Sequence, residues 1–410
     1  MCDQPLVDTV RGAIRQSDTL QLGAIPLLYP LLDTLGLRDT INALCPSEAD
    51  LDVGRVMLML VLNRLMSPQP LCWVDRWAAR TVLGVALDVP PAKLYDNRLG
   101  RALDAVYPQL GEIWARLVVR ATQVWQLDLS ILHWDITSFY FQGAYTDSEL
   151  IRYGHSRDHQ SEAKQINLQA DVTHQTRVPV GYTVLAGNTA DITRPLGHLD
   201  ALLRFLARPA LAALNLHPIL VSDCKMITPE AIGGCHHNDL FYLGPWARDR
   251  QVLRVLHSVS EDDLAAQVLT YRPRRQAQVA DFVPYRGVWR PFTIKVAPPP
   301  DQPEAKPEMF TDRVLVVWSV GKARLDAQKR RTYLKRLLDG LENIRRQLNQ
   351  GRYAQRDYVV ERLTSVRRGN PTKPLVTVDL QGTDQALHLK FRLNRDRLAT
   401  EQALDGRYAL

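Results

Sequence analysis

The chain has 410 residues, 46% of them apolar and 23% charged, which is the balance of a soluble globular protein and excludes a disordered or membrane protein. This length suits two or three domains of roughly 100–200 residues each. The 51 Lys and Arg outnumber the 44 Asp and Glu, giving a net charge of +7 and a pI near 9.2. Such a charge favours a polyanionic partner such as nucleic acid.

No targeting segment is expected at the start of the chain, because Met1 to Pro5 show no basic region followed by an apolar one. The most apolar run, Val56 to Leu62, lies between Arg55 and Asn63 and is far shorter than the roughly 20 residues of a membrane span. We therefore expect a cytoplasmic protein without a membrane partner.

The five cysteines are scattered and form no CxxC pair, so the pattern indicates neither a disulfide framework nor a zinc ribbon. Cys224, Cys235, His236 and His237 are the one grouping that could suggest a metal cluster. Adjacent histidines do not have the spacing of zinc motifs, so we expect structural roles for all four.

Residues 1–128 are predicted to form an all-helical N-terminal domain, with apolar residues at helical spacing. Prolines separate the helical segments, since proline removes a backbone donor and disfavours helix at the preceding residue. The expected helices lie near 27–37, 53–66, 71–83 and 98–125.

From residue 129 the pattern changes to strands rich in β-branched and aromatic residues. Expected strands at 131–141, 165–172 and 178–185 suggest an antiparallel meander. A helix at 191–206, a strand at 217–223, a helix near 228–233 and a strand at 240–243 follow. This order matches an α/β fold, an RNase H-like mixed sheet with flanking helices, over residues 129–245.

Residues 246–380 are interpreted as an insertion in that core, with strands at 283–296 and 314–319, a proline-rich stretch at 298–303 and a long basic helix at 326–348. Residues 381–410 are expected to return to the core, with strands at 387–393 and 406–410 around a short helix.

Asp135 and Asp223 are the candidate catalytic and metal-binding residues. Each lies in or at the end of an otherwise apolar strand, where an ionised carboxylate is costly unless it is paired or binds a metal. Two carboxylates from neighbouring strands would repel unless a divalent cation lay between them. Mg²⁺ or Mn²⁺ suits such hard oxygen ligands, and a pair of these ions supports phosphodiester chemistry. The alternative is that both aspartates cap turns or helices.

The segments around these aspartates resemble the insertion-sequence transposases of the DDE class. The resemblance lies in residues 133–138, 153–159, 164–168, 187–191 and 221–227, in the family's order, and extends over nearly the whole chain. It implies an RNase H-like core, two Mg²⁺ or Mn²⁺ ions held by Asp135 and Asp223, and an N-terminal domain that binds DNA ends.

The resemblance also implies a function. Members bind the terminal inverted repeats of their element, cut the DNA and join the freed end to target DNA, which makes a homodimer and association with the nucleoid plausible. Cys224 and Lys225 stand where the family usually has Arg-Gly. The last residues, 404–410, resemble the strand that precedes the helix bearing the catalytic glutamate. We therefore expect a C-terminally truncated enzyme of impaired activity, with Glu361 and Glu401 as solvated residues rather than substitutes.

Two sets of residues are candidates for DNA contacts. Arg157 and His159 lie in a polar loop near the first aspartate. The long helix carries several basic residues, each able to release counterions on binding a phosphate, although interspersed acids leave open a merely solvated arm. Its candidates are Lys329, Arg330, Arg331, Lys335 and Arg336.

Two rival functions remain. One is an inactive DNA-end-binding protein that competes with full-length transposase. The other is an interaction protein without a nucleic-acid role, for which DNA binding that weakens with salt would be contrary evidence.

Overall fold

The computed structural model describes residues 20–154, 162–189, 194–223, 227–266, 268–271, 283–298 and 304–410. The chain forms two compact units. The first contains residues up to Val221 together with Asp239–Phe241, and the second contains Ser222–Asn238 together with Tyr242–Leu410.

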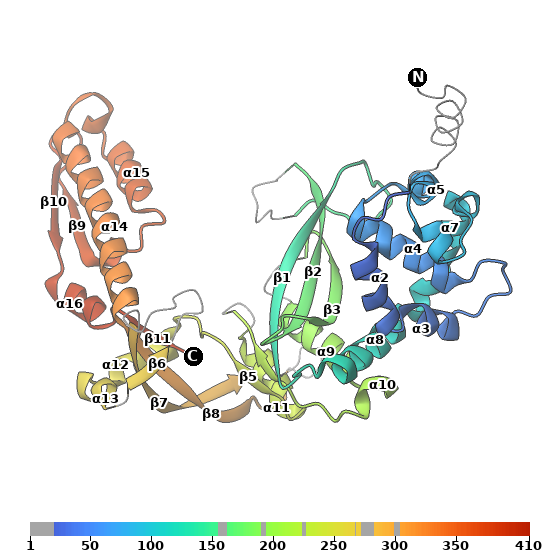
Figure 1. Ribbon diagram of the computed structural model, residues 1–410. Helices are drawn as coiled ribbons and strands as arrows, with labels where there is room; N and C mark the ends of the chain where they lie inside the picture. The colour runs from blue at the N-terminus through green and yellow to red at the C-terminus, as the bar shows by residue number, and fades with distance from the viewer. Residues whose placement is uncertain are drawn as a thin grey trace, which may run out of the picture. The chain divides into compact units, whose positions relative to one another are not determined.

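The first unit begins with a helical region, as predicted (Figure 1). Met59 and Leu62, on the central helix of this region, are fully buried in its core. The predicted segment at 98–125 divides near Pro108, since proline lacks the backbone donor that a continuous helix needs. The elements are α2 (Ile25–Thr34), α3 (Leu37–Leu44), α4 (Val53–Met66), η1 (Leu71–Trp73), α5 (Val74–Ala79), α6 (Leu83–Ala86), η2 (Pro91–Lys93), α7 (Asp96–Val106), η3 (Tyr107–Gln109) and α8 (Leu110–Trp125).

A mixed five-stranded sheet follows, in the order β3-β2-β1-β4-β5. Its strands are β1 (Ile131–Phe141), β2 (Lys164–Thr173), β3 (Pro179–Ala186), β4 (Ile219–Val221) and β5 (Phe241–Leu243). The first three strands form the predicted antiparallel meander, whereas β4 pairs with β1 in parallel. The helices α9 (Arg194–Leu206) and α10 (Pro209–Ala212) connect β3 to β4, and α9 contacts β3 (Figure 1). This places the predicted elements at 131–206 within a few residues of their expected bounds.

The strand β2 buries its polar side chains rather than its apolar ones. Its apolar side chains are only half-buried, and its buried side chains are all polar, at 1–5% exposure. Several of them are satisfied locally: Asn167 accepts a hydrogen bond from the Ser138 hydroxyl at 2.8 Å and donates to the Gly187 carbonyl at 3.2 Å. The buried polar residues are Gln165, Asn167, Gln169, Asp171 and Thr173.

The second unit contains a four-stranded antiparallel sheet in the order β11-β8-β7-β6. Its elements are α11 (Pro229–His237), α12 (Arg250–Ser258), α13 (Glu261–Ala265), β6 (Val268–Tyr271), β7 (Val283–Val296), β8 (Glu308–Ser319) and β11 (Arg407–Ala409). The last strand pairs with β8, so the expected return of residues 381–410 to the five-stranded sheet is corrected. Tyr408 lies opposite Val317, and Ala409 packs in the core of the four-stranded sheet, which accounts for this pairing.

A separate hydrophobic core lies along the long helix of the second unit. Leu337, Leu341 and Ile344 of α14 pack with Leu363 and Val376. Figure 1 shows this helix beside a hairpin and a second helix. The elements are α14 (Val320–Gln347), η6 (Gly351–Ala354), α15 (Arg356–Arg367), η7 (Lys373–Leu375), β9 (Val376–Gln381), β10 (His388–Leu393) and α16 (Arg395–Ala403).

The helix α14 begins six residues before its predicted start, because the Ser319 side chain accepts a hydrogen bond from the Lys322 amide and caps it. Of the helices in the described ranges, none is both long and apolar enough to cross a membrane.

Candidate functional site

Asp135 lies in the middle of β1 and its side chain is exposed. One carboxylate oxygen accepts a hydrogen bond from the Ile136 amide at 2.7 Å. In the sheet register Asp135 is opposite Ala170, which is opposite Tyr182, so these three side chains share one face. Exposure removes the desolvation cost that the sequence suggested for this carboxylate.

Asp223 is the second residue after β4 and is also exposed. The parallel pairing of β1 with β4 ends with His133 opposite Val221. Asp135 and Asp223 therefore each follow the last residue of the β1 and β4 pairing by two positions, although Asp135 remains paired with β2. Cys224 and Lys225, the departures from the family pattern, lie outside the described residues.

The donor chemistry of these two residues fits a hard divalent cation, since carboxylate oxygens are the ligands that Mg²⁺ and Mn²⁺ prefer. Within the ranges that the structure describes, no group of three or more His, Cys, Asp or Glu residues is arranged to hold a metal ion. Two carboxylates would leave the remaining coordination positions to water and to other oxygen ligands, as is common for Mg²⁺.

The histidines next to Cys235 bind carboxylates of β8. His236 Nε2 lies 2.8 Å from Asp312, which also accepts a hydrogen bond from the Tyr242 hydroxyl at 2.5 Å. His237 Nε2 lies 2.9 Å from Glu308. Burial raises the pKa of the Cys235 thiol to about 11, so it is protonated at neutral pH. These contacts attach α11 to β8, which is a structural role.

The basic residues of α14 fall into two groups. Arg330 forms a bidentate ion pair with Asp405, both distances being 2.5 Å, and its side chain is 14% exposed. This pair engages the guanidinium within the protein and favours a structural role for Arg330, whereas the predicted DNA contact of Arg330 stays a prediction. Lys329, Arg331 and Lys335 are exposed, and the described part of the chain offers them no ion-pair partner.

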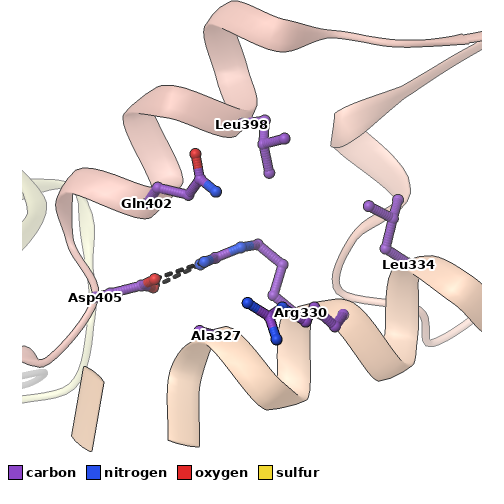
Figure 2. A pocket seen from close by; sticks show the side chains of 7 residues that line it. Ala327, Arg330, Leu334, Leu398, Gln402 and Asp405 are labelled. Carbon is purple, nitrogen blue, oxygen red and sulfur yellow. Dashed lines mark hydrogen bonds and ion pairs between the residues drawn. The ribbon is translucent and has the colours of Figure 1, made fainter. Parts of the chain in front are cut away.

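A cavity of about 260 Å³ lies between α14 and α16. Figure 2 shows Leu398 and Gln402 of α16 on one side and Ala327 and Leu334 of α14 on the other, with the pair of Arg330 and Asp405 between the helices. Arg331 also lines it. Because Arg330 is already paired, Arg331 is the lining cation available to an anion from outside.

The positive charge of the chain is concentrated in one region. Residues 320–404 contain 19 of the 51 Lys and Arg but 9 of the 44 Asp and Glu, a net charge of +10 against +7 for the whole chain. The remainder of the chain is therefore slightly acidic. Electrostatic attraction to a polyanion would originate mainly in this region.

The other predicted site residues are placed as follows. Arg157 and His159 lie outside the described residues. Arg336 is exposed and its guanidinium lies 6.0 Å from the centre of the Tyr333 ring. Glu361 and Glu401 are exposed, as expected for solvated helix residues.

Sequence reasoning missed a buried polar cluster beside Asp135. Asp171 Oδ1 lies 2.9 Å from His198 Nε2, and the two side chains are 1% and 2% exposed. The His198 ring stacks on Trp134 with ring centres 4.0 Å apart and 13° between the planes. The sequence does show a polar residue at every second position of β2, which could have indicated a polar cluster. It does not show that Asp171 of β2 pairs with His198 of α9.

The comparisons with known proteins give limited likeness. Residues 17–117 match the family model described as a domain of unknown function, DUF4277. No curated protein matches the chain.

Two solved structures illustrate the structural likeness. The Mos1 transposase in a paired-end complex with the left transposon end has 12% identity and a TM-score of 0.21, covering 48% of this chain and 60% of its own. The piggyBac transposase in a synaptic complex with hairpin DNA has 14% identity and a TM-score of 0.30, covering 73% of this chain and 63% of its own. The chain spans less than two thirds of either protein, and TM-scores of this size do not establish a common fold.

Proposed function

We propose that this chain is a transposase of the DDE class from a bacterial insertion sequence, which uses an RNase H-like core to cut and join DNA. The observation that supports the proposal is the parallel pairing of β1 with β4 in a β3-β2-β1-β4-β5 sheet, which ends two residues before Asp135 in one strand and two residues before Asp223 in the other. Asp223 follows the end of β4, and sites in α/β proteins commonly gather where strands end and loops leave side chains accessible, whereas Asp135 lies within β1. The motif resemblance around both aspartates supports the same reading.

In this proposal Asp135 and Asp223 are the protein ligands of Mg²⁺ or Mn²⁺. Such ions, when bound, supply charge stabilisation and an activated oxygen nucleophile for phosphodiester chemistry. The contribution of the chain would be to present two carboxylates just beyond the residues that pair β1 with β4. The exposure of both side chains leaves them accessible to a DNA backbone.

The DNA partner, as element ends and as target, is supported by the charge of residues 320–404. Lys329, Arg331 and Lys335 provide exposed cations for phosphates on α14. The helical region that matches DUF4277 is the proposed end-binding domain. A homodimer is proposed because joining requires two ends to be held together.

The test is cleavage of a labelled duplex that carries the DNA bordering the chain's own gene. We expect Mn²⁺-dependent cutting by the wild type. Asp135→Asn and Asp223→Asn should each reduce the rate by at least about 100-fold, the upper end of the loss caused by residues that only orient a metal ligand. Asp147→Asn, which changes an exposed carboxylate farther along the same region, should cut at the wild-type rate.

Two outcomes would contradict the proposal in different ways. Cutting that is unaffected by both substitutions would place the chemistry elsewhere. Binding of the duplex without cutting would favour the second candidate, a DNA-end-binding protein without catalysis, which the charge of residues 320–404 also supports.

A further inference from the structure

One row of side chains crosses three strands of the first unit directly beside the row that contains Asp135. In this row Trp134 of β1 lies opposite Asp171 of β2, which lies opposite Gly181 of β3. Successive side chains of a strand point to opposite faces, so Trp134 projects away from the face that carries Asp135. His198, on α9, covers the Trp134 ring and binds Asp171.

The cluster is costly to bury. Asp171 Oδ2, His198 Nδ1 and Trp134 Nε1 are inaccessible to solvent and have no hydrogen-bond partner among the residues that the structure describes. A polar atom that is buried without a hydrogen-bond partner destabilises the folded state by its full desolvation penalty. An apolar pair in the same space would avoid this cost, so the polar pair calls for an explanation other than stability.

The backbone of β3 lies close to the Asp171 carboxylate. A Cβ atom at Gly181 would lie 2.5 Å from Asp171 Oδ2, so any side chain there would displace the carboxylate. Leu199 and Leu202, on the same helix as His198, are also buried, at 4% and 2% exposure. The backbone at Gly181 and the bond to His198 therefore hold the Asp171 carboxylate in one arrangement.

We propose that Asp171 and His198 are positioning residues for Asp135. Asp171 orients the imidazole, the imidazole fixes the plane of the Trp134 indole, and the indole fixes the backbone of β1 at the adjacent residue. A metal ligand has to be held within about 0.5 Å of its productive place, and the neighbouring Cα atoms of Trp134 and Asp135 transmit any shift directly. This inference rests on the proposed metal-binding role of Asp135.

The experiment titrates the purified full chain with Mn²⁺ alone, followed by electron paramagnetic resonance of the free ion, and measures thermal unfolding in parallel. His198→Phe keeps a ring over Trp134 but removes the bond to Asp171. Asp171→Asn keeps the size of the side chain but removes its charge. We expect each to weaken Mn²⁺ binding by about 10- to 100-fold, as for other residues that orient metal ligands.

Leu202→Ala is the matched control, because it removes a buried side chain from the same face of α9 without changing Trp134, Asp171 or His198. It should lower the unfolding temperature and leave the Mn²⁺ affinity of the folded protein unchanged. In the cleavage assay, saturating Mn²⁺ should restore His198→Phe to within a few-fold of the wild-type rate, which a fold defect would not allow.

Two results overturn the inference and are distinguishable. If Asp135→Asn abolishes Mn²⁺ binding while His198→Phe binds with wild-type affinity, the positioning role is wrong and the metal site stands. If the wild type binds no more Mn²⁺ than Asp135→Asn, the metal site itself is wrong, and the positioning role falls with it. Should Asp171→Asn fail to fold, His198→Phe alone decides between these results.

Discussion

Asp50 lies between two basic side chains in the helical region of the first unit. Lys93 Nζ and Arg98 Nη1 each lie 2.7 Å from its carboxylate oxygens. The hydrogen bonds from Lys93 and then from Arg98 lower the pKa of the Asp50 carboxyl from 3.8 to about 2. The Asp50 carboxylate therefore connects its own loop to two residues that lie more than 40 positions later in the chain.

This pair of bonds gives a pH-dependent stability of defined sign. Because the pKa of Asp50 is lower in the folded state than in the unfolded state, its contribution is complete above about pH 4 and is lost as the pH falls through about 2. We expect Asp50→Asn to remove this part of the acid dependence in urea unfolding between pH 2 and 5. The effect should be small, since the group is solvent-exposed and screened.

Asp104→Asn serves as the control, since Asp104 is exposed on α7 and makes no ion pair in the part of the chain that the structure describes. It should retain the wild-type acid dependence. An Asp50→Asn variant with the same slope as the wild type would show that the two bonds do not persist in solution.

The residue scale also limits what the sequence could predict. Asp135 and Asp223 were identifiable because each carboxylate interrupts an apolar strand. Asp171 was not, because it lies in an alternating strand that suggests the opposite orientation, with apolar residues inside and polar residues outside. Alternation of apolar and polar residues identifies a strand but does not show which of its two faces is buried. In β2 the polar face is buried, and its Asp171 binds His198 of α9, which lies 27 residues later in the chain.

At the scale of elements, one side of α14 forms an ion pair within the protein and another side carries exposed basic residues. Arg330 faces Asp405, whereas Arg331 and Lys335 are four residues apart on the exposed side, one helical turn from each other. Sequence alone does not separate Arg330 from Arg331, since the partner lies 75 residues away.

This division predicts that substitution of Arg331 weakens DNA binding, whereas substitution of Arg330 lowers stability. Arg331→Ala with Lys335→Ala should weaken binding to duplex DNA and lower the slope of log affinity against log salt by about 1 for each phosphate that the variant no longer binds. The unfolding free energy should hardly change, because both side chains are exposed. Fluorescence anisotropy at several salt concentrations measures the slope.

Arg330→Met is the matched variant on the same helix. It should leave the salt slope unchanged and lower the free energy of unfolding by about 1.5–3 kcal/mol, as for a hydrogen-bonded charge that loses its partner. The reverse pattern, with a smaller slope for Arg330→Met and an unchanged slope for the double variant, would assign DNA binding to the other side of α14.

The elements themselves were predictable to different degrees. The meander at 131–186 and the helix α9 follow from periodicity and turn residues, and their predicted bounds are close. Strand pairing was less accessible: β11 pairs with β8, about 90 residues earlier, rather than with the first sheet. A three-residue strand at Arg407–Ala409 carries too little pattern to specify its partner.

At the scale of the whole molecule, the positive charge is concentrated in one unit, whereas the two candidate aspartates are divided between both units. Asp135 belongs to the first unit, and Asp223 and the region of net charge +10 belong to the second. The proposed reaction requires two components, a basic region that would bind DNA non-specifically and a pair of carboxylates that would bind metal ions. Composition predicted the polyanionic partner, but the net charge of +7 concealed the concentration of that charge in residues 320–404.

The central claim is that Asp135 and Asp223 together hold a divalent cation. The most direct measurement is Mn²⁺ binding by electron paramagnetic resonance for the wild type, Asp135→Asn, Asp223→Asn and the double variant. We expect each single substitution to abolish most of the binding and the double variant to lose no more than either one, because the two carboxylates share one ion. Equal binding by all four proteins, or losses that add independently, would contradict the claim.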